Sequence, residues 1–379
     1  MPKQILIAIL LIASFSCGKP GEDITVDTFS YSVDTVTVDA KGEILYLEYE
    51  LRVADYSEVD GFLYNFNKHS HSIEKIDLDR LEWVRTFPLQ QEGPDGTGFW
   101  ISDIKGLREG QLFLSGEKAG IYNLEGELLK KIDWSIVSPE EGGILDEEKF
   151  YIQVINPNFP ESAFSLFVNY TKNSVILKKL DVSQNRIAII DIDPNDNYKT
   201  YTLGDLSTYN HWAPRVNINS QRDKIIVSHE FANDFYVYSP YSDSLQAVNY
   251  NAAYTPSKVT CTTEGDLVNS TDDRKNALQY YLGQVSFGKL IWDAKHQRYY
   301  RFSSSTQYGE EEHMGWLLPE ISNSKVYLSI FDTEFNLLDE SPIPELNGLP
   351  LSKYFVKDGM LWVFMNLDDE MGFVRVIFE

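Results

Sequence analysis

The chain has 379 residues, of which 57 are Asp or Glu and 33 are Lys or Arg, so its formal net charge is −24; aromatic residues make up 13%. This length exceeds the usual size of one compact core, so we expect either two domains or one repetitive domain. The acidity excludes nucleic acid and anionic lipid headgroups as partners bound through charge.

The first 16 residues have the order of a secretory signal peptide. One cation, Lys3, precedes the uncharged run from Ile5 to Ala13, and small residues follow before Cys17. The apolar run is shorter than the ~20 residues that a membrane-spanning helix needs. A cysteine after small residues resembles the lipobox of bacterial lipoproteins, whose thiol is acylated (palmitate is one such lipid) and becomes the mature N-terminus.

We therefore predict a signal peptide over 1–16, a lipidated tether over 17–25 that begins at Cys17, and one folded domain over 26–379. The protein would then be anchored to the outer membrane through the lipid, on its periplasmic or its surface face. The alternative is a soluble secreted protein that is cleaved near Ser16. If Cys17 carries the lipid, the other cysteine, Cys261, has no disulfide partner, and we interpret it as a small buried hydrophobe.

From about Phe29 onward the pattern is strand-like nearly throughout. The stretch from Tyr31 to Val38 alternates with the period of a half-buried strand. This early strand, Thr28 to Val38, has no hairpin partner of its own. We expect it to pair with the last repeat unit and so to close a ring without a free edge.

A hairpin unit recurs along the chain, in which an apolar strand ends in an aromatic or aliphatic residue plus Asn, Asp or Ser, followed by a polar turn and a second strand. The terminal Asn or Asp is expected to close the turn with its own side chain, and the aromatic residue to fill the space between sheets. The units lie at Phe62–Ile76, Gly120–Leu129, Phe164–Leu177, Phe235–Leu245, Leu290–Tyr300, Leu328–Leu338 and Met360–Ile377.

These spacings fit four-stranded blades of ~40–50 residues, so we predict an all-β fold, a β-propeller with seven blades or, as the count left open, six. Two stacked β-sandwiches are the alternative fold. Short helical turns are expected within 134–148 and 272–279.

The most glycine-dense loop, Gln90 to Trp100, is not a phosphate cradle, because no Lys-Ser/Thr follows it and the next residues read as a strand. We interpret it as an inter-blade connection whose glycines need left-handed backbone. Glu92 and Asp95 in this loop are candidates for facing a ligand.

The segment Asp191 to Asn197 has oxygen-bearing side chains at alternate positions, as a calcium loop has. Its sixth position is Asp196 rather than Gly and its twelfth is Thr202 rather than Glu. A turn at the end of a strand explains the same residues. We predict no cofactor, with calcium at this loop kept open.

Further candidate ligand-binding residues lie in three separate repeat units, which a propeller would bring together at the mouth of its channel. Such a group would suit a metal, a sugar or an acid–base pair; alternatively, each residue stabilises its own blade. His69 and His71 fall in a hairpin turn and are read as exposed. The candidates are His211, Trp212, Arg215, His229, Glu230, His313 and Trp316.

The leader, the loop from Gln91 to Gly96, and the strand from Met360 to Val363 with the following Met371-Gly372-Phe373 together resemble a known group. They are similar to the propeller lipoproteins of Bacteroidetes that form domain-of-unknown-function family 4221. The resemblance implies a lipid-anchored propeller of the cell envelope. The family has no established activity, so the resemblance supplies no catalytic residues.

Two functions are consistent with these observations. The first is a binding or scaffolding module that presents a rigid face to a protein, peptide or glycan. The second is a hydrolase or lyase acting on a carbohydrate, with its site at the channel mouth. An enzyme requires ionisable groups that converge within a few ångströms, whereas a scaffold requires only a shaped surface. The oligomeric state stays open.

Overall fold

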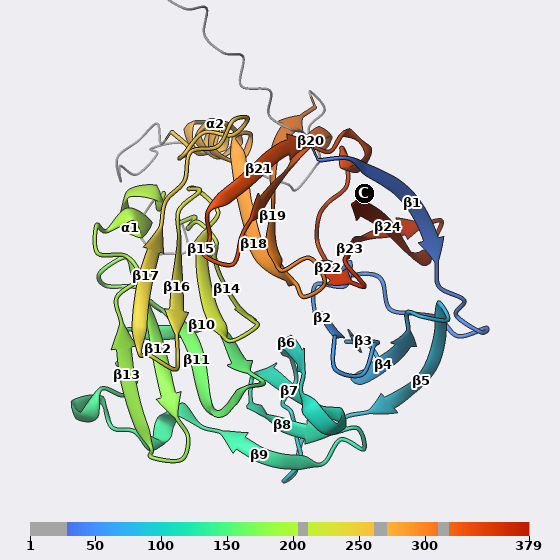
Figure 1. The fold of residues 1–379 in the computed structure, drawn as a ribbon. Helices are drawn as coiled ribbons and strands as arrows, with labels where there is room; N and C mark the ends of the chain where they lie inside the picture. Colours follow the sequence, from blue (N-terminus) through green and yellow to red (C-terminus); the bar gives the residue numbers. More distant parts are fainter. Residues whose placement is uncertain (1–28, 204–210, 261–270, 310–317, 379) are drawn as a thin grey trace, which may run out of the picture.

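The structure, a computed structural model, describes residues 29–203, 211–260, 271–309 and 318–378. Within them the strands form six four-stranded antiparallel sheets arranged around a common axis (Figure 1). Each of the first five sheets is a meander of four consecutive strands. They are β2 Ala54–Ser57, β3 Phe62–Asn67, β4 Ser72–Asp77 and β5 Glu82–Pro88; β6 Ile101–Gly106, β7 Gln111–Gly116, β8 Ala119–Asn123 and β9 Leu128–Ile132; β10 Glu148–Asn156, β11 Phe159–Asn169, β12 Ser174–Asp181 and β13 Arg186–Ile190; β14 Val216–Gln221, β15 Lys224–His229, β16 Phe235–Ser239 and β17 Ser244–Val248; β18 Val285–Asp293, β19 Arg298–Tyr308, β20 Ile321–Phe331 and β21 Leu337–Pro342.

The sixth sheet closes the ring, as the sequence predicts. It consists of β22 Tyr354–Lys357, β23 Met360–Leu367, β24 Glu370–Phe378 and, outermost, β1 Tyr31–Thr37. β1 runs antiparallel to β24, from the pair Tyr31 and Phe378 to the pair Thr37 and Gly372. Arg375 donates two hydrogen bonds to the carboxylate of Asp34, one of them 2.7 Å long, and so fastens the two strands together. The edge of the last sheet is therefore covered by the start of the chain.

The propeller has six blades. Of the two counts that the sequence left open, six is therefore correct, and the favoured count of seven is one too many. The units Leu290–Tyr300 and Leu328–Leu338 are the hairpins β18–β19 and β20–β21 of one sheet. Every two-stranded hairpin of a meander has the same local pattern, so two hairpins of one blade are counted as two blades. Six separate sheets around an axis also exclude the two stacked sandwiches.

Helical segments are short and lie between the strands. The α-helices are α1 Asn197–Tyr201 and α2 Thr271–Leu282, and the 3-10 turns are Arg108–Gly110, Trp134–Ile136, Pro139–Glu141 and Pro344–Leu346. The turns within 134–148 are as expected, whereas α2 is longer than the single turn predicted there. No helix in the described part of the chain has the length and apolarity needed to cross a membrane.

The core is divided among the blade interfaces. Each pair of neighbouring sheets encloses one cluster of buried apolar side chains. The interface between the sixth and the first blade, for example, contains Leu63, Ile76, Trp362 and Phe373. Burial of this apolar surface is what orients the blades and fixes the width of the channel between them.

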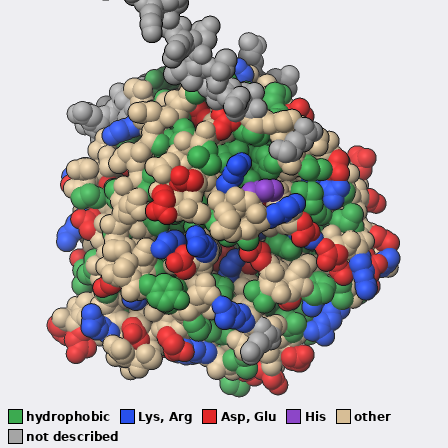
Figure 2. Space-filling model, viewed as in Figure 1, with side chains coloured by type: hydrophobic (Ala, Val, Ile, Leu, Met, Phe, Trp, Pro, Cys, Tyr) green, Lys and Arg blue, Asp and Glu red, His purple; other side chains and the backbone are tan. Residues whose placement is uncertain are grey.

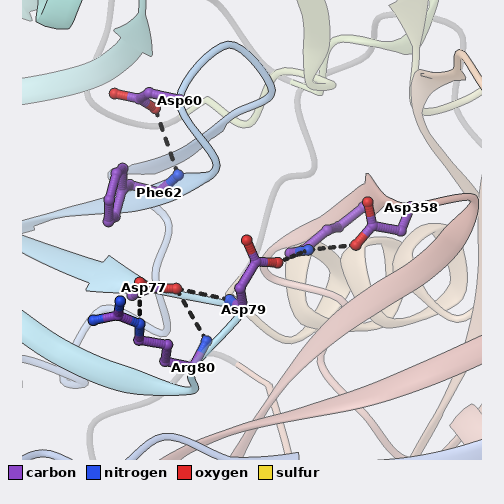
Figure 3. A network of polar contacts seen from close by, with 7 residues as sticks. Asp60, Phe62, Asp77, Asp79, Arg80 and Asp358 are labelled. Atoms are coloured by element: carbon purple, nitrogen blue, oxygen red, sulfur yellow. Dashed lines mark hydrogen bonds and ion pairs between the residues drawn. The ribbon is translucent and has the colours of Figure 1, made fainter.

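Polar turns complete the same interface. The side chain of Lys357 forms ion pairs with Asp79, from the turn between β4 and β5, and with Asp358, from the turn between β22 and β23. Figure 3 shows Asp79 and Asp358 facing each other across this interface. Asp77 accepts hydrogen bonds from the backbone N–H groups of Asp79, at 2.9 Å, and Arg80, at 3.0 Å.

The predicted role of the residue at each strand end is confirmed in these units. Asn123 accepts hydrogen bonds from the N–H groups of Glu125 and Glu127, and Asp293 accepts them from Lys295 and His296. The neighbouring aromatic residues Tyr122 and Trp292 are buried between blades. Short-range turn chemistry thus follows directly from the sequence.

Candidate ligand-binding channel

The innermost strands of the blades are β2, β6, β10, β14, β18 and β22 (Figure 1). They surround a cavity of about 300 Å³. Its wall carries one more cation than carboxylates, although acidic residues predominate in the chain by 57 to 33. Figure 2 shows Lys and Arg side chains gathered among acidic ones around the hollow in the middle of this face. The cationic residues of the wall are Arg52, Lys105, Arg215, Lys289 and Lys353, and its carboxylates are those of Asp55, Glu58, Asp103 and Glu230.

Two of these charged residues lie at irregularities of the inner strands. The register of β6 against β7 shifts between Ile101 and Asp103, and that of β18 against β19 shifts between Phe287 and Leu290, where Lys289 lies. An extra residue in one strand bends it and changes the direction of the adjacent side chains, and such bulges are frequent beside functional sites. Both Asp103 and Lys289 line the cavity.

The bulge at Lys289 is fixed by its neighbours. The backbone N–H of Lys289 donates to the hydroxyl of Tyr354 at 2.8 Å, and that hydroxyl donates to the carbonyl of Lys289 at 3.0 Å. The buried guanidinium of Arg301 donates to the carbonyl of Gly288 at 2.9 Å. A Cβ on Gly288 would lie 2.5 Å from the Tyr354 hydroxyl, so only glycine fits this close approach.

Asp55 and Lys105 neutralise each other within the channel. The ammonium of Lys105 lies 3.2 Å from Oδ1 of Asp55, and the other carboxylate oxygen accepts a hydrogen bond from the N–H of Gly106 at 2.9 Å. Burial lowers the pKa of Lys105, but the charge and hydrogen bond of Asp55, together with the charges of Glu58 and Asp103, offset this and raise it overall. This ion pair joins β2 to β6.

Three further charges converge without such pairing. Among the residues that the structure describes, neither the carboxylate of Asp103 nor the ammonium of Lys289 has a hydrogen-bond or ion-pair partner, and Lys353 donates only to the carbonyl of Ala54. Burial raises the pKa of Asp103 to about 6, against the lowering effect of Lys289 and Lys353. Burial also lowers the pKa of Lys353 to about 8, against the charges of Asp55 and Asp103.

This arrangement can bind a polar ligand and can exchange protons. Unpaired charges in a cavity cost free energy unless a ligand satisfies them, and shifted pKa values of this kind gather at functional sites. A carboxylate and an ammonium with pKa values on either side of neutrality are also the groups needed for acid–base chemistry.

Of the residues predicted from the sequence, Arg215 and Glu230 do line the channel. The N–H of Arg215 donates to Oε1 of Glu230 at 2.7 Å, and its guanidinium lies 3.6 Å from the other carboxylate oxygen. Glu230 is buried, which raises its pKa against the effect of Arg215, whereas the Arg215 side chain is 74% exposed. Arg215 therefore lies at the mouth of the channel and Glu230 behind it.

The other predicted residues of this group lie elsewhere. His229 is buried with its ring 4.8 Å from that of Phe231, and burial lowers its pKa to about 4, so the imidazole is neutral at physiological pH. Trp212 packs edge-to-face on Tyr281, with ring centroids 4.5 Å apart. His211 is exposed. His313, Trp316, Cys17 and Cys261 lie outside the described residues.

The glycine-rich loop is an inter-blade connection between β5 and β6, as interpreted. Gly93 and Gly98 have φ values of +90° and +86°, which favour glycine. Asp95 accepts a hydrogen bond from the N–H of Leu128 at 3.0 Å, so it stabilises the loop against the next blade. Glu92 is exposed.

His71 is not exposed, contrary to expectation. It is buried, and its Nε2 lies 2.8 Å from Oγ1 of Thr97 in the glycine-rich loop. The hairpin turn places His71 at a positive φ of 48°, so its side chain turns inward toward that loop. His69, two residues earlier, is exposed as expected.

The carboxylate of Asp193 in the candidate calcium loop has another role. It accepts hydrogen bonds from the N–H groups of Asn197 and Tyr198, both at 2.8 Å, at the start of α1. The loop residues are thus explained by a helix start. Within the described ranges, no group of three or more His, Cys, Asp or Glu side chains is placed to hold a metal ion.

Sequence reasoning did not find Asp55, Asp103, Lys105, Lys289 or Lys353. Each is a charged residue within or just before a short apolar strand, and four different strands supply them. The available signal was the position of a charge in the first strand of a repeat unit, because in a propeller that strand lines the axis.

Comparisons with known proteins identify the family. A family of domains of unknown function, DUF4221, matches residues 27–342. A solved DUF4221 member from Bacteroides vulgatus is similar at 13% identity and a TM-score of 0.62, covering 92% of this chain and 98% of its own. A protein from Bacteroides fragilis that is described as exported is similar at 9% identity and a TM-score of 0.53, covering 94% of this chain and 98% of its own. No curated protein matches the sequence. Because the family match spans most of the chain and the solved member has the same fold, this protein belongs to the DUF4221 family.

Proposed function

We propose that the protein is a lipid-anchored binding module of the cell envelope and that the propeller channel binds its ligand. The observation that carries this proposal is the convergence of Asp103, Lys289 and Lys353 in a cavity where their charges are not fully paired. A cavity of about 300 Å³ is at the small end of ligand sites, so it suits a small molecule or the end of a glycan or peptide.

The channel is tested with a variant that fills it. Ser286 is exposed on β18 and lines the cavity, so Ser286→Trp places a large ring there. Ser322→Trp, at an exposed position of β20, is the matched control. We expect a panel of small carboxylates, sugars and amino acids to contain compounds that raise the melting temperature of the wild type and of Ser322→Trp but not of Ser286→Trp. The proposal is wrong if every stabilising compound acts equally on Ser286→Trp.

Anchoring is supported by the leader and Cys17, and by the relative described as exported. Its test is metabolic labelling with a palmitate analogue in cells that express the full chain. We expect Cys17→Ala to abolish labelling and to release the protein from membranes, while Cys261→Ala leaves both unchanged. Equal labelling of Cys17→Ala and wild type would disprove the anchor.

A second candidate function is that of an enzyme whose site contains the same channel residues. The shifted pKa values of Asp103, about 6, and Lys353, about 8, favour it because both groups can exchange protons near neutral pH. A lyase or hydrolase of glycans would release shorter chains from an acidic polysaccharide, and Asp103→Asn would stop that release. Binding without any product, measured by chromatography, would favour the binding module.

A further inference from the structure

The charges of the channel wall indicate what kind of ligand it takes, an inference that rests on the proposed function. The wall carries one cation more than carboxylates, and the pairs Asp55–Lys105 and Glu230–Arg215 are already satisfied within the protein. Arg52 forms an ion pair with Glu50, which lies outside the wall, and Glu58 is exposed. The half-buried charges that remain are the ammonium of Lys289, which lacks a partner among the described residues, the ammonium of Lys353, and the carboxylate of Asp103. Among these half-buried groups, two cations therefore accompany one carboxylate.

We propose that Lys289 and Lys353 bind the carboxylate of a small acidic ligand, while Asp103 accepts a hydrogen bond from a neighbouring hydroxyl or ammonium of that ligand. A ligand carboxylate gives Lys289 the partner that it lacks, and charge-assisted hydrogen bonds of this kind are strong. A ligand donor does the same for Asp103. The cavity, about 300 Å³, limits the bound part to about one sugar ring or one amino acid.

The site is built to keep these groups in place. Tyr354 binds both backbone polar groups of Lys289, and the buried Arg301 fixes the preceding carbonyl of Gly288. Lys353 directly precedes Tyr354, the first residue of β22, so the residue that holds the backbone of Lys289 is the chain neighbour of Lys353. Preorganised groups of this kind reduce the entropy lost on binding.

The overall negative charge of the protein affects how an acidic ligand would bind in the channel. A chain with net charge −24 repels anions at long range, so an anion would bind only where local positive charge outweighs that field. Screening by salt removes the long-range repulsion but affects contacts inside the cavity much less. Binding of an acidic ligand is therefore expected to persist, or to strengthen, as salt rises to physiological levels.

The test is calorimetric titration of the folded protein with D-glucuronate, L-glutamate and neutral D-glucose. We expect at least one of the two acids to bind and glucose to bind at least tenfold more weakly; the acid that binds distinguishes a sugar acid from an amino acid. Lys289→Met should weaken acid binding at least tenfold. Lys325→Met, at an exposed strand lysine outside the channel, should leave it unchanged.

Binding of neither acid, binding of glucose as tight as that of the acids, or unchanged acid binding by a folded Lys289→Met would each overturn the inference. A different result would refute the acidic ligand while leaving the proposed function intact. If Ser286→Trp blocks a neutral ligand that Lys289→Met still binds, the channel is a binding site but not one for acids. Melting temperatures of all variants show whether they are folded.

Discussion

The interfaces between the blades and the channel along the axis are opposite environments within one ring. The interfaces are filled with apolar and aromatic side chains, and the charges at their rims, such as Lys357 with Asp79 and Asp358, are paired. The channel contains half-buried charges, of which Asp103 and Lys289 have no direct partner among the described residues. The contrast places the stability of this protein between its blades; under the proposed function the ligand binds at the axis, where the unpaired charges cost some stability.

The largest effect is expected from removing the strand that closes the ring. Deletion of residues 29–37 removes β1, the hydrogen bonds of β24 to it, and the ion pair of Asp34 with Arg375. With ~0.5–1.5 kcal/mol for each hydrogen bond and the lost burial added, we expect a loss of ~5 kcal/mol or more in unfolding free energy, measured by urea denaturation. Arg375→Met should lower it by only ~1–2 kcal/mol. A deletion as stable as the wild type would show that β1 does not close the ring.

A single interface residue is expected to matter next. Trp362 is 2% exposed and packs on Phe373, so Trp362→Ala should cost about 3–5 kcal/mol of unfolding free energy. Trp100→Ala, at a tryptophan that is 52% exposed, should change it by less than about 0.5 kcal/mol. Equal losses from both variants would mean that the interfaces do not carry the stability.

A charged residue of the channel is expected to have a smaller effect on the unfolding free energy, and this effect depends on pH. Here the wild-type side chain lowers stability near neutral pH instead of raising it. Because the folded-state pKa of Asp103 is raised to about 6, its contribution to stability is fully present below its unfolded value near 4 and is lost as pH rises through 6. Relative to Asp103→Asn, the wild type should therefore lose about 1–2 kcal/mol between pH 4 and pH 7. Asp103 is influenced by the charges of Lys289, Lys353, Asp55 and Lys105, and Lys353, with its pKa of about 8, stays charged over this range.

The control for this comparison is Asp146→Asn, at an exposed aspartate outside the channel. Its stability difference from the wild type should not change in the same direction between pH 4 and pH 7. Thermal unfolding at closely spaced pH values measures both differences. A pH-independent difference for Asp103→Asn would mean that its carboxylate is not buried among charges as described.

The same contrast explains what could be predicted from the sequence. Alternation in 31–38 and the Asn or Asp at strand ends predict strands, turns and the closing pair β1–β24, because these are local or repeated patterns. Of the two blade counts left open, seven was favoured over the correct six because β18–β19 and β20–β21 look like separate units. The channel charges were missed because Asp103 and Lys289 are far apart in the chain and only the ring closure brings them together.

Only some of the predicted site residues line the channel, again because residues far apart in the chain meet there. Arg215 and Glu230 were found because they lie beside conspicuous aromatic and histidine residues, and both line the channel. His229, chosen for its chemistry, is neutral and buried among aromatic rings instead. Residue type alone does not reveal which side of an inner strand faces the axis.

The most direct test of the channel as the ligand site is a crystal structure of the protein soaked with D-glucuronate and, in parallel crystals, L-glutamate. The account predicts density for an acid in the cavity, with its carboxylate within hydrogen-bond distance of Lys289 and Lys353 and one of its hydroxyl or amino groups against Asp103. An acid bound only on the outer loops, for example beside the exposed Trp100 or Tyr254, with the channel free of it, would contradict the account.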